Sequence, residues 1–550
     1  MNACKRIWNR VGIYGPIVLL QYVAVVLFNF LYTDNAVDSD TAKLLRHAVE
    51  MSRNHTLNIR EWLHTTTMEW DTSALLAAPF YTFTHNIYIS AAIANTIITA
   101  LFICLIIRLF DRFELSIKTA LKACMVFLIP YAFGMLDYFN LLMFGGSQYV
   151  FRVMIPILLL IIIMTPPAGR IGVENILLGI LALILIIIAS ISSGLYIVVS
   201  CVLPILFVVI LDALIGGDFR RFDLYQYVVC GVALIASIIG AVISIRIGEA
   251  NFGNTMSLLR WYDLRYYLQC FAEGYFRLMG AMPGAVQDES VAVFSLRGFA
   301  FLIKLMISVL IIVTFIVGLV QTVRAQARKA SQHGTQDAGN STSAVPDIRY
   351  WLCGIALVNL IILLVCETRY SSLNSTLEYR YLIPVVIPVL LCVPLQLELW
   401  QDSWSTYLRN AVWIVFTAGV LYTTAVCYMD AHDKLDPYAY CYEVVAYVQD
   451  SGYNTAIFMD DRPTAECCRI IDMDREYEAY SSAGSMDIVD YYLDACYSHF
   501  YDDEHLLFVI SGVSLPDVLG DRAGLYTFRE TILWFDVYEA GEFALGMADE

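Results

Sequence analysis

Two carboxylates closely follow the first long apolar segment of the chain. Ile13–Tyr32 is apolar, and Asp38 and Asp40 come shortly after it with a single serine between them. Carboxylates at the end of a membrane-length segment lie where water meets lipid headgroups, and partial desolvation there raises their basicity. Such a group can take a proton from a hydroxyl. The triplet Asp38-Ser39-Asp40 also suits a helix N-cap, because Asp and Ser side chains accept hydrogen bonds from unpaired amides.

The next residues favour an amphipathic helix. Thr41–Arg53 carries apolar residues at helical spacing, and these form one stripe: Ala42, Leu44, Leu45, Ala48 and Val49. A helix with one apolar and one charged face is typical of segments that lie in the membrane interface. The sequence therefore predicts that the carboxylates are held at the membrane surface.

A second group of polar residues could bind an anion. Arg369 and Arg380 flank a polar segment late in the chain, and Tyr381 follows Arg380 at the start of an apolar run. A guanidinium at the mouth of a helix can pair with a phosphate through two hydrogen bonds. An aromatic belt with an arginine that extends toward water is an equally good explanation of this pattern.

The composition places these groups in a membrane protein. Of 550 residues 59% are hydrophobic and 15% charged, whereas soluble proteins have roughly 45–50% and about 25%. We expect a polytopic α-helical membrane protein with about eleven transmembrane helices. The predicted spans are Ile13–Tyr32, Ile87–Arg108, Thr119–Leu136, Val150–Thr165, Asn175–Ile191, Leu195–Ala213, Tyr225–Ile245, Gly298–Thr322, Trp351–Cys366, Tyr381–Leu397 and Ala411–Tyr428.

The distribution of Lys and Arg predicts the orientation. Basic residues gather in alternate short loops, which places the N-terminus in the cytoplasm and the C-terminus outside. Residues 1–430 would then form a transmembrane domain and residues 431–550 an extracytoplasmic one. Within the first, we expect outer loops at 33–86 and 246–297 and a flexible cytoplasmic linker at 325–347.

The C-terminal segment is acidic and reads as a small α/β domain. Residues 431–550 contain 25 Asp and Glu but 6 Lys and Arg, which argues against nucleic acid as a partner. Periodicity predicts a helix at Tyr438–Gln449 and strands at Thr455–Met459, Leu506–Ile510 and Ile532–Tyr538. The adjacent Cys467 and Cys468 predict neither a disulfide nor a zinc site.

Together these features resemble the GT-C superfamily of membrane glycosyltransferases. The similarity lies in the first-loop triplet Asp38-Ser39-Asp40, the downstream Asn54-His55-Thr56-Leu57, Trp62 and Thr65-Thr66, and the late motif Arg380-Tyr381-Leu382-Ile383-Pro384. It extends to the whole architecture, including a small extracytoplasmic α/β domain at the end. The resemblance is to a group of little-characterised bacterial members.

The resemblance implies transfer of a hexosyl or pentosyl group from a polyprenyl-phosphate donor to an extracytoplasmic acceptor, which is an envelope glycan, lipid or protein. Asp38 or Asp40 would be the general base, and Arg380 or the weaker candidate Arg369 would bind the departing phosphate. The expected substrate-binding residues also include Tyr381, Glu69 and Asp71. The His-Pro-Pro frequent in the family is replaced here by Glu69-Trp70-Asp71, so the sugar class is left open.

The sequence identifies no cofactor with certainty and leaves the oligomeric state open. A divalent cation, Mg²⁺ or Mn²⁺, held by Asp38 and Asp40 with Glu69 or Asp71 is an option, since carboxylate oxygens suit hard cations.

Two other functions compete with sugar transfer. A transporter or flippase for a lipid-linked substrate would place charges near the middle of its spans, whereas the charged groups here gather near span ends and outside them. A non-catalytic envelope-assembly protein would use the acidic domain for binding. The position of the carboxylates favours the enzyme.

Overall fold

The structure of the protein is a computed structural model. It describes residues 10–35, 37–59, 62, 67–134, 137–164, 172–216, 224–247, 257–258, 264–282, 291–333, 347–367, 379–434, 438–480 and 504–540. The chain divides into two compact units. Unit 1 comprises residues 1–28, 67–72 and 95–433, and unit 2 comprises residues 29–66, 73–94 and 434–550.

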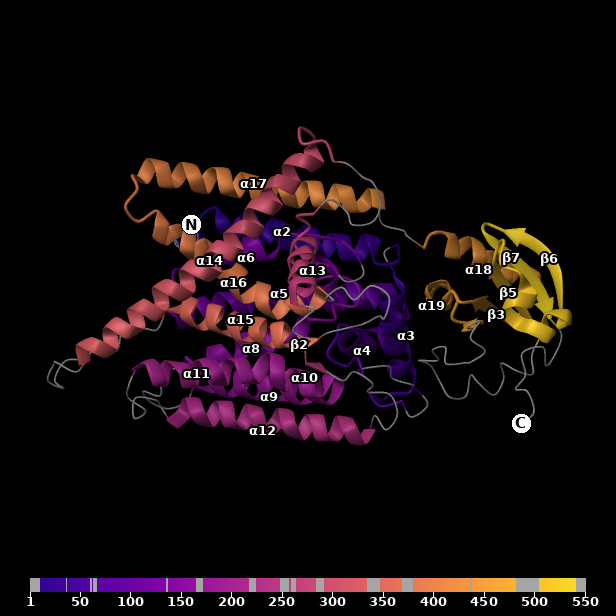
Figure 1. Ribbon diagram of the computed structural model, residues 1–550, viewed down its shortest axis with the longest axis horizontal. Helices are drawn as coiled ribbons and strands as arrows, with labels where there is room; N and C mark the ends of the chain where they lie inside the picture. The colour runs from indigo at the N-terminus through magenta and orange to yellow at the C-terminus, as the bar shows by residue number, and fades with distance from the viewer. Residues whose placement is uncertain are drawn as a thin grey trace. The chain divides into compact units, whose positions relative to one another are not determined.

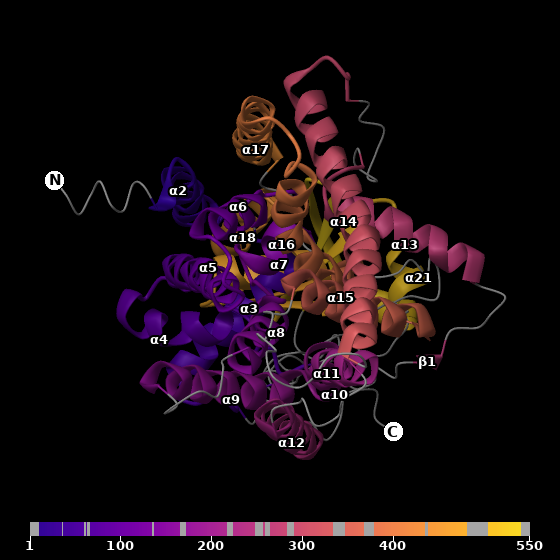
Figure 2. The same ribbon diagram turned by 90° about the vertical axis from the view of Figure 1, so that its left-hand side faces the viewer.

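Unit 1 is built almost entirely from helices (Figures 1 and 2). The boundary between the units falls within α2 and α5, so both helices contribute to each unit. The elements are α2 Tyr14–Tyr32, α5 Ile87–Arg112, α6 Ile117–Phe127, α7 Tyr138–Leu142, α8 Val150–Ile163, α9 Val173–Ser193, α10 Leu195–Ile197, the π-helix η1 Val198–Val202, α11 Leu203–Gly216, α12 Leu224–Ile247, α13 Leu264–Leu278, α14 Leu296–His333, α15 Ile348–Val365, the 3-10 turn η4 Tyr379–Leu382, α16 Ile383–Trp400 and α17 Thr406–Lys434.

Among the described residues, nine helices are long and apolar enough to cross a membrane. They coincide with nine of the predicted spans, so the chain is a multi-pass α-helical membrane protein. The other two predicted spans are shorter helices. The run predicted at Thr119–Leu136 is helical only over α6, because Pro130 follows its end and cannot continue a helix. The run at Val150–Thr165 is helical over the 14 residues of α8.

Both short helices are core elements of the protein. Every residue of α8 is buried, and so is α6 from Thr119 onward. A helix of 14 residues is about 21 Å long, which is less than the roughly 30 Å of a bilayer core. The sequence could not separate them from spans, because an apolar run looks the same whether lipid or protein covers it.

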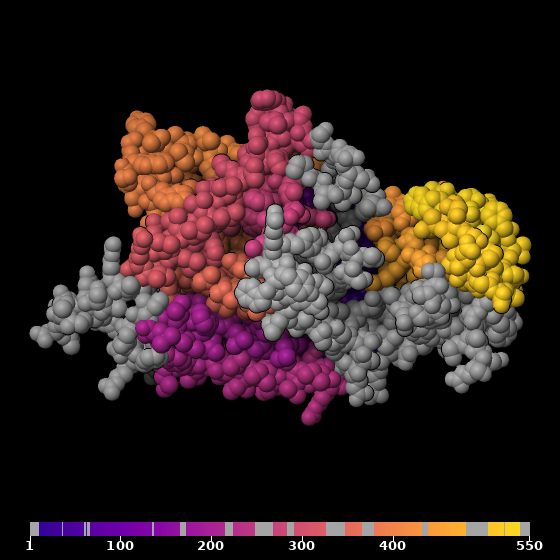
Figure 3. Space-filling view, in the orientation of Figure 1, coloured from indigo at the N-terminus to yellow at the C-terminus, as the bar shows by residue number. Residues whose placement is uncertain are grey.

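The packing of α9 against α12 shows how the long helices associate. Figures 1 and 2 both place these helices side by side. Gly240 of α12 lies so close to α9 that an added Cβ would be 2.6 Å from the Cβ of Ser190. The opposite side of α12 is apolar and exposed, along the lower edge of Figure 3. Its exposed residues are Leu224, Val228, Val232, Ile235, Ile238, Ile239, Val242 and Ile245, which is the pattern of a lipid-facing helix.

Two predicted connecting segments contain regular structure. The helix α14 extends through His333 into the predicted linker at 325–347, because Ala, Gln, Arg and Lys favour helix there; residues 334–346 lie outside the described part. The predicted outer loop at 246–297 contains α13, and its two-residue strand β1, Ser257–Leu258, pairs with β2, Cys366–Glu367.

Unit 2 combines four helices with a mixed sheet. The helices are α3 Ser39–Arg53, α4 Ala74–Thr84, α18 Tyr440–Ser451 and α19 Arg462–Ile471, joined by the shorter α21 Leu515–Leu519 and the 3-10 turn η5 Gly520–Leu525. The strands are β3 Thr455–Met459, β4 Glu476–Tyr480, β5 His505–Ile510, β6 Tyr526–Ile532 and β7 Phe535–Ala540, in the order β4-β3-β5-β7-β6. Strands β4, β3 and β5 are parallel, whereas β7 is antiparallel to both β5 and β6.

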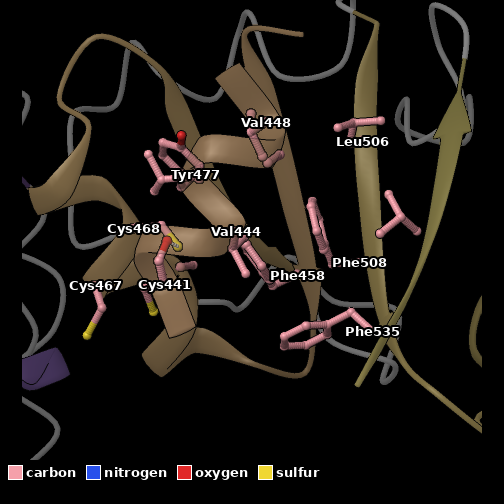
Figure 4. Packing of buried hydrophobic residues seen from close by; sticks show 14 residues of the cluster. Cys441, Val444, Val448, Phe458, Cys467, Cys468, Tyr477, Leu506, Phe508 and Phe535 are labelled. Carbon is pink, nitrogen blue, oxygen red and sulfur yellow. Dashed lines mark hydrogen bonds between the residues drawn. The ribbon is translucent and has the colours of Figure 1, made fainter. Parts of the chain in front are cut away.

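The sheet has an apolar core on each face. Alternate residues of β3 point to opposite sides, so Phe458 packs with α18 and α19 whereas Ile457 packs with α21; Figure 4 shows the first of these cores. The predicted small α/β domain is confirmed. The strand predicted at Ile532–Tyr538 exists as β7 from Phe535 onward, but its start was wrong, because the chain turns at Leu533, which has a φ of 55°, between β6 and β7.

Candidate functional site

Asp38 is the N-cap of α3. Its Oδ1 atom accepts a hydrogen bond of 2.8 Å from the backbone amide of Thr41, which confirms the cap predicted for this triplet. The carboxylate is 6% exposed. Burial, together with the nearby negative charge of Asp40, raises the pKa of Asp38 to about 7. At neutral pH the residue is therefore present in both its protonated and its ionised form.

Asp40 lies in the first turn of the same helix. Its side chain is partly exposed, and a carboxylate at this place interacts favourably with the helix dipole. The two predicted base candidates thus differ in environment. Asp38 has the perturbed pKa that proton transfer near neutral pH requires.

The apolar stripe of α3 is covered by protein. Leu45, Ala48 and Val49 are fully buried, and α3 packs on α4 and α19 within unit 2. The prediction that this stripe lies in the membrane interface was therefore wrong. The sequence misled because α19, the partner of α3, lies more than 400 residues further along the chain.

A set of buried charges lies on α19. Glu466 is 2% exposed, and its carboxylate lies 3.4 Å from the guanidinium of Arg462 and 3.9 Å from that of Arg469. Arg469 also pairs with Glu478 of β4. Within unit 2 this network fixes α19 to the sheet, and α19 in turn supports α3 and its cap.

In unit 1, Arg380 and Tyr381 lie in the turn η4 that leads into α16. The guanidinium carbon of Arg380 is 5.6 Å from the centre of the Tyr381 ring. The Tyr381 ring lies 5.7 Å from that of Tyr196 and 6.4 Å from that of Tyr149. Part of the predicted phosphate site therefore adjoins an aromatic cluster.

Arg152 is held inside this cluster, and sequence reasoning did not select it. Its guanidinium carbon lies 4.3 Å from both the Tyr149 and the Tyr196 ring centres, and its Nε atom is 3.7 Å from Oδ2 of Asp71. Cations over aromatic faces are stabilised by the ring quadrupole. The clue in the sequence was a single arginine in the otherwise apolar run at 150–165.

The contacts of Asp71 show that it positions this cluster. The hydroxyl of Ser192 donates to Oδ1 over 2.6 Å, and that of Ser193 donates to Oδ2 over 2.7 Å. Arg152 donates in turn to Ser193 over 3.1 Å. The neighbouring Glu69 has a φ of 61°, and its carbonyl accepts a hydrogen bond from Thr72. Both oxygens of Asp71 are thus engaged by the protein.

An apolar pocket opens beside Arg152. It lies among α8, α15 and α16, and apart from Arg152 and Asn359 its lining is apolar. The lining residues are Arg152, Val153, Pro156, Ile157, Leu160, Leu352, Ile355, Asn359, Pro384, Ile387, Pro388 and Leu391. The lining is apolar in character, and the guanidinium of Arg152 is its charged group.

Asp137 is a second group that the sequence analysis missed. It lies before α7, and partial burial raises the pKa of its carboxyl. The Tyr379 hydroxyl donates to it, and the positive charges of Arg277 and Lys304 partly offset the effect of burial. The Arg277 guanidinium lies 4.8 Å from the Tyr379 ring centre. The signal was an isolated acidic residue within an apolar stretch.

The comparisons with known proteins identify the fold. No protein-family model matches the sequence, and no curated protein matches it. Among solved structures, the chain is similar to the archaeal oligosaccharyltransferase AglB from Archaeoglobus fulgidus, solved with an inhibitory peptide and a dolichol-phosphate. The TM-score is 0.52 at 11% identity, covering 91% of this chain and 70% of AglB. This protein has the GT-C fold.

A second similar structure is ArnT from Cupriavidus metallidurans, solved with undecaprenyl phosphate. Its TM-score is 0.49 at 11% identity, covering 95% of this chain and 97% of ArnT. The GT-C fold expected from the sequence is confirmed by the likeness to AglB.

The remaining predicted site residues are not brought together by described contacts. Arg369 lies outside the described residues. Asp38 and Asp40 belong to unit 2, whereas Arg380, Glu69 and Asp71 belong to unit 1, so a shared site for them stays a prediction.

Metal binding also stays a prediction. Within the part of the chain that the structure describes, no three His, Cys, Asp or Glu side chains are grouped so that they could hold a metal ion. A Mg²⁺ or Mn²⁺ ion on Asp38 and Asp40 would need a further ligand from elsewhere.

Proposed function

We propose that this chain is a membrane glycosyltransferase that moves a sugar from a polyprenyl-phosphate donor to an acceptor on the extracytoplasmic side. The observation that carries the proposal is Asp38. This buried carboxylate has its pKa raised to about 7 and lies at the start of the first loop helix of a GT-C fold. Perturbed pKa values of this kind gather at functional sites.

Asp38 acts as the general base in the proposed reaction. Its ionised carboxylate takes the proton of the acceptor hydroxyl, whose oxygen attacks the anomeric carbon of the donor sugar. The bond from that carbon to the phosphate oxygen breaks, and polyprenyl phosphate leaves with the bonding electrons. General-base assistance typically contributes about 10²–10⁴-fold to the rate.

Arginines of unit 1 bind the donor in this proposal. Arg380 pairs with the phosphate, since a guanidinium matches phosphate oxygens in geometry and charge. The apolar lining among α8, α15 and α16 suits contact with the isoprenoid chain, with Arg152 beside it. AglB, which shares the fold, was solved with a dolichol-phosphate, a lipid of the same chemical class.

The proposal is tested with Asp38→Asn, Asp40→Asn and the control Asp34→Asn. Asn caps a helix about as well as Asp, so Asp38→Asn keeps α3 while removing the base. Asp34 lies in the same loop but is exposed. Each variant is expressed in a strain that lacks the gene, and envelope glycans are compared with those of the null and wild-type strains.

We expect Asp38→Asn to reproduce the glycan profile of the null strain and Asp34→Asn to restore that of the wild type. Arg380→Ala should weaken the use of the lipid donor. If the null strain differs from wild type and Asp38→Asn, present in normal amounts, restores the wild-type glycans, the chain does not transfer sugar through Asp38.

A further inference from the structure

Three cysteines of unit 2 meet in its core, although they are far apart in the sequence. Cys441 belongs to α18, whereas Cys467 and Cys468 belong to α19, and all three are at most 1% exposed. Figure 4 shows them together where α18 packs against α19. The vicinal pair alone suggested no disulfide, but the fold supplies the third sulfur.

The contacts of the three sulfurs differ. The Sγ atom of Cys468 lies 3.9 Å from the carbonyl oxygen of Cys441 and so approaches the main chain of α18. The Sγ atom of Cys441 lies 4.0 Å from the carbonyl oxygen of Thr464, one helical turn before Cys467. Cys467 has its Sγ atom 3.8 Å from the carbonyl oxygen of Val37, the residue before Asp38.

We propose that Cys441 and Cys467 form a disulfide in the mature protein, with Cys468 left as a thiol. Adjacent residues of a helix point about 100° apart, so Cys441 can bond to one of the two. The regular helical backbone of α19 disfavours a bond between Cys467 and Cys468 themselves. This domain is predicted to lie outside the cytoplasm, where disulfides persist.

In the closed cluster the sulfur of Cys441 lies beside both other thiols, and its larger interaction is with Cys467. These interactions lower the pKa of the Cys441 thiol in the folded core. The thiolate is the reactive form of cysteine. Because the folded core buries all three sulfurs, the reaction takes place before α18 and α19 have closed on one another.

Formation of the Cys441–Cys467 bond needs an oxidant, and a second disulfide, in a small molecule or a protein thiol oxidase, supplies it. The Cys441 thiolate attacks one sulfur of that disulfide, and the other sulfur leaves as a thiolate. The Cys467 thiolate then attacks Cys441 in the mixed disulfide and releases the second oxidant sulfur. Two cysteine thiols are oxidised, and one external disulfide is reduced to two thiols. The bond joins α18 to α19, the helix on which α3 and its Asp38 cap pack.

Peptide mapping of the full-length protein tests the proposal. Cells are precipitated in acid and the protein is alkylated with N-ethylmaleimide in denaturant, so that buried free thiols are trapped as well, and it is purified without reductant. Cleavage must fall before Asp460, because cleavage after basic residues leaves all three cysteines in one peptide: Arg462 precedes a proline. A cut at Asp460 separates Cys441 from the other two.

We expect a peptide with Cys441 linked to one with Cys467 in which Cys468 carries the maleimide. Cys468→Ser is the matched control and should keep the link, whereas Cys467→Ser should release Cys441 in a labelled form. Labelling of Cys441 and Cys467 in the wild type would overturn the proposal, and so would a link from Cys441 to Cys468. Fragmentation of the wild-type peptide gives the pairing even if Cys467→Ser fails to fold. The result does not depend on sugar transfer.

Discussion

The carboxylate of Asp38 caps a helix and is buried, two conditions with opposite effects on its charge. The hydrogen bond from Thr41 favours the ionised form, whereas burial favours the neutral form and has the larger effect. Helix N-caps are commonly Ser, Thr, Asn or Asp side chains. The pKa of Asp38, raised to about 7, supports its role as a base.

The pH dependence of sugar transfer should follow the ionisation of Asp38. Because a base must be deprotonated, we expect the rate to rise with pH about a midpoint near 7, the pKa of this carboxyl. Stability changes in the opposite direction, since a raised carboxyl pKa stabilises the fold at low pH and this contribution is lost as pH rises toward 7. The rate profile is measured with membranes and a lipid-linked donor. A midpoint near 4 would show that another carboxylate is the base.

The buried pair of Asp71 and Arg152 should be needed for the stability of unit 1. Replacing Asp71 with Ala leaves Arg152 buried without its counter-charge. It also removes the oxygens that accept hydrogen bonds from the hydroxyls of Ser192 and Ser193. We expect a loss of about 3–5 kcal/mol in the free energy of unfolding.

Thermal unfolding in detergent measures this effect. Asp111→Ala is the control, because Asp111 is exposed and its pair with Arg108 is a surface pair of little worth. Equal melting temperatures for the two variants would contradict the importance assigned to the Asp71 pair.

At the scale of elements, the sequence predicted what periodicity and length determine. Nine spans, the strand at Thr455–Met459 and the helix after Asp38 all follow from local patterns. Local sequence patterns did not predict elements whose packing partners are distant in the sequence or whose buried residues are charged. The helix α19 was missed because its buried Glu466 and Arg469 look like surface residues. Asp137 and the cysteine cluster were missed because only the tertiary fold gives them their neighbours.

The contact between α9 and α12 should depend on Gly240. A Cβ there would meet the Cβ of Ser190 at 2.6 Å and the carbonyl oxygen of Ile187 at 3.0 Å. We expect Gly240→Ala to destabilise the protein by about 1–3 kcal/mol, the usual cost of overpacking. Gly231 is the matched control in the same helix, since a Cβ there meets nothing within 4 Å. Thermal unfolding in detergent should separate the two; a stable Gly240→Ala protein would show that the helices part easily.

At the scale of the whole molecule, the charge distribution determines which reaction is feasible. The basic loops predict that the acidic domain lies outside, on the side where Asp38 also begins its helix. Because α6 and α8 are shorter than a membrane span, the number of membrane crossings decides on which side the C-terminus lies. Sugar transfer outside the cell requires that Asp38 and the acidic domain both lie on the outer side of the membrane.

A compartment-sensitive reporter fused after Glu550 tests this orientation. We expect activity from a reporter that works only outside the cytoplasm, and no activity from one that works only inside it. A fusion after Ala325, at the end of the membrane-length part of α14, should give the reverse result. A cytoplasmic signal at Glu550 would remove the acidic domain from the reaction.

Unit 2 is assembled from three separated stretches of chain, the last of which starts at Lys434. During synthesis α3 leaves the ribosome early, whereas α19 is made only after nearly all the membrane helices. The apolar side of α3 can therefore pack on α4 early in translation but waits for α19 until the membrane helices have been made. Unit 2 closes late, whatever the rate at which its separate helices form.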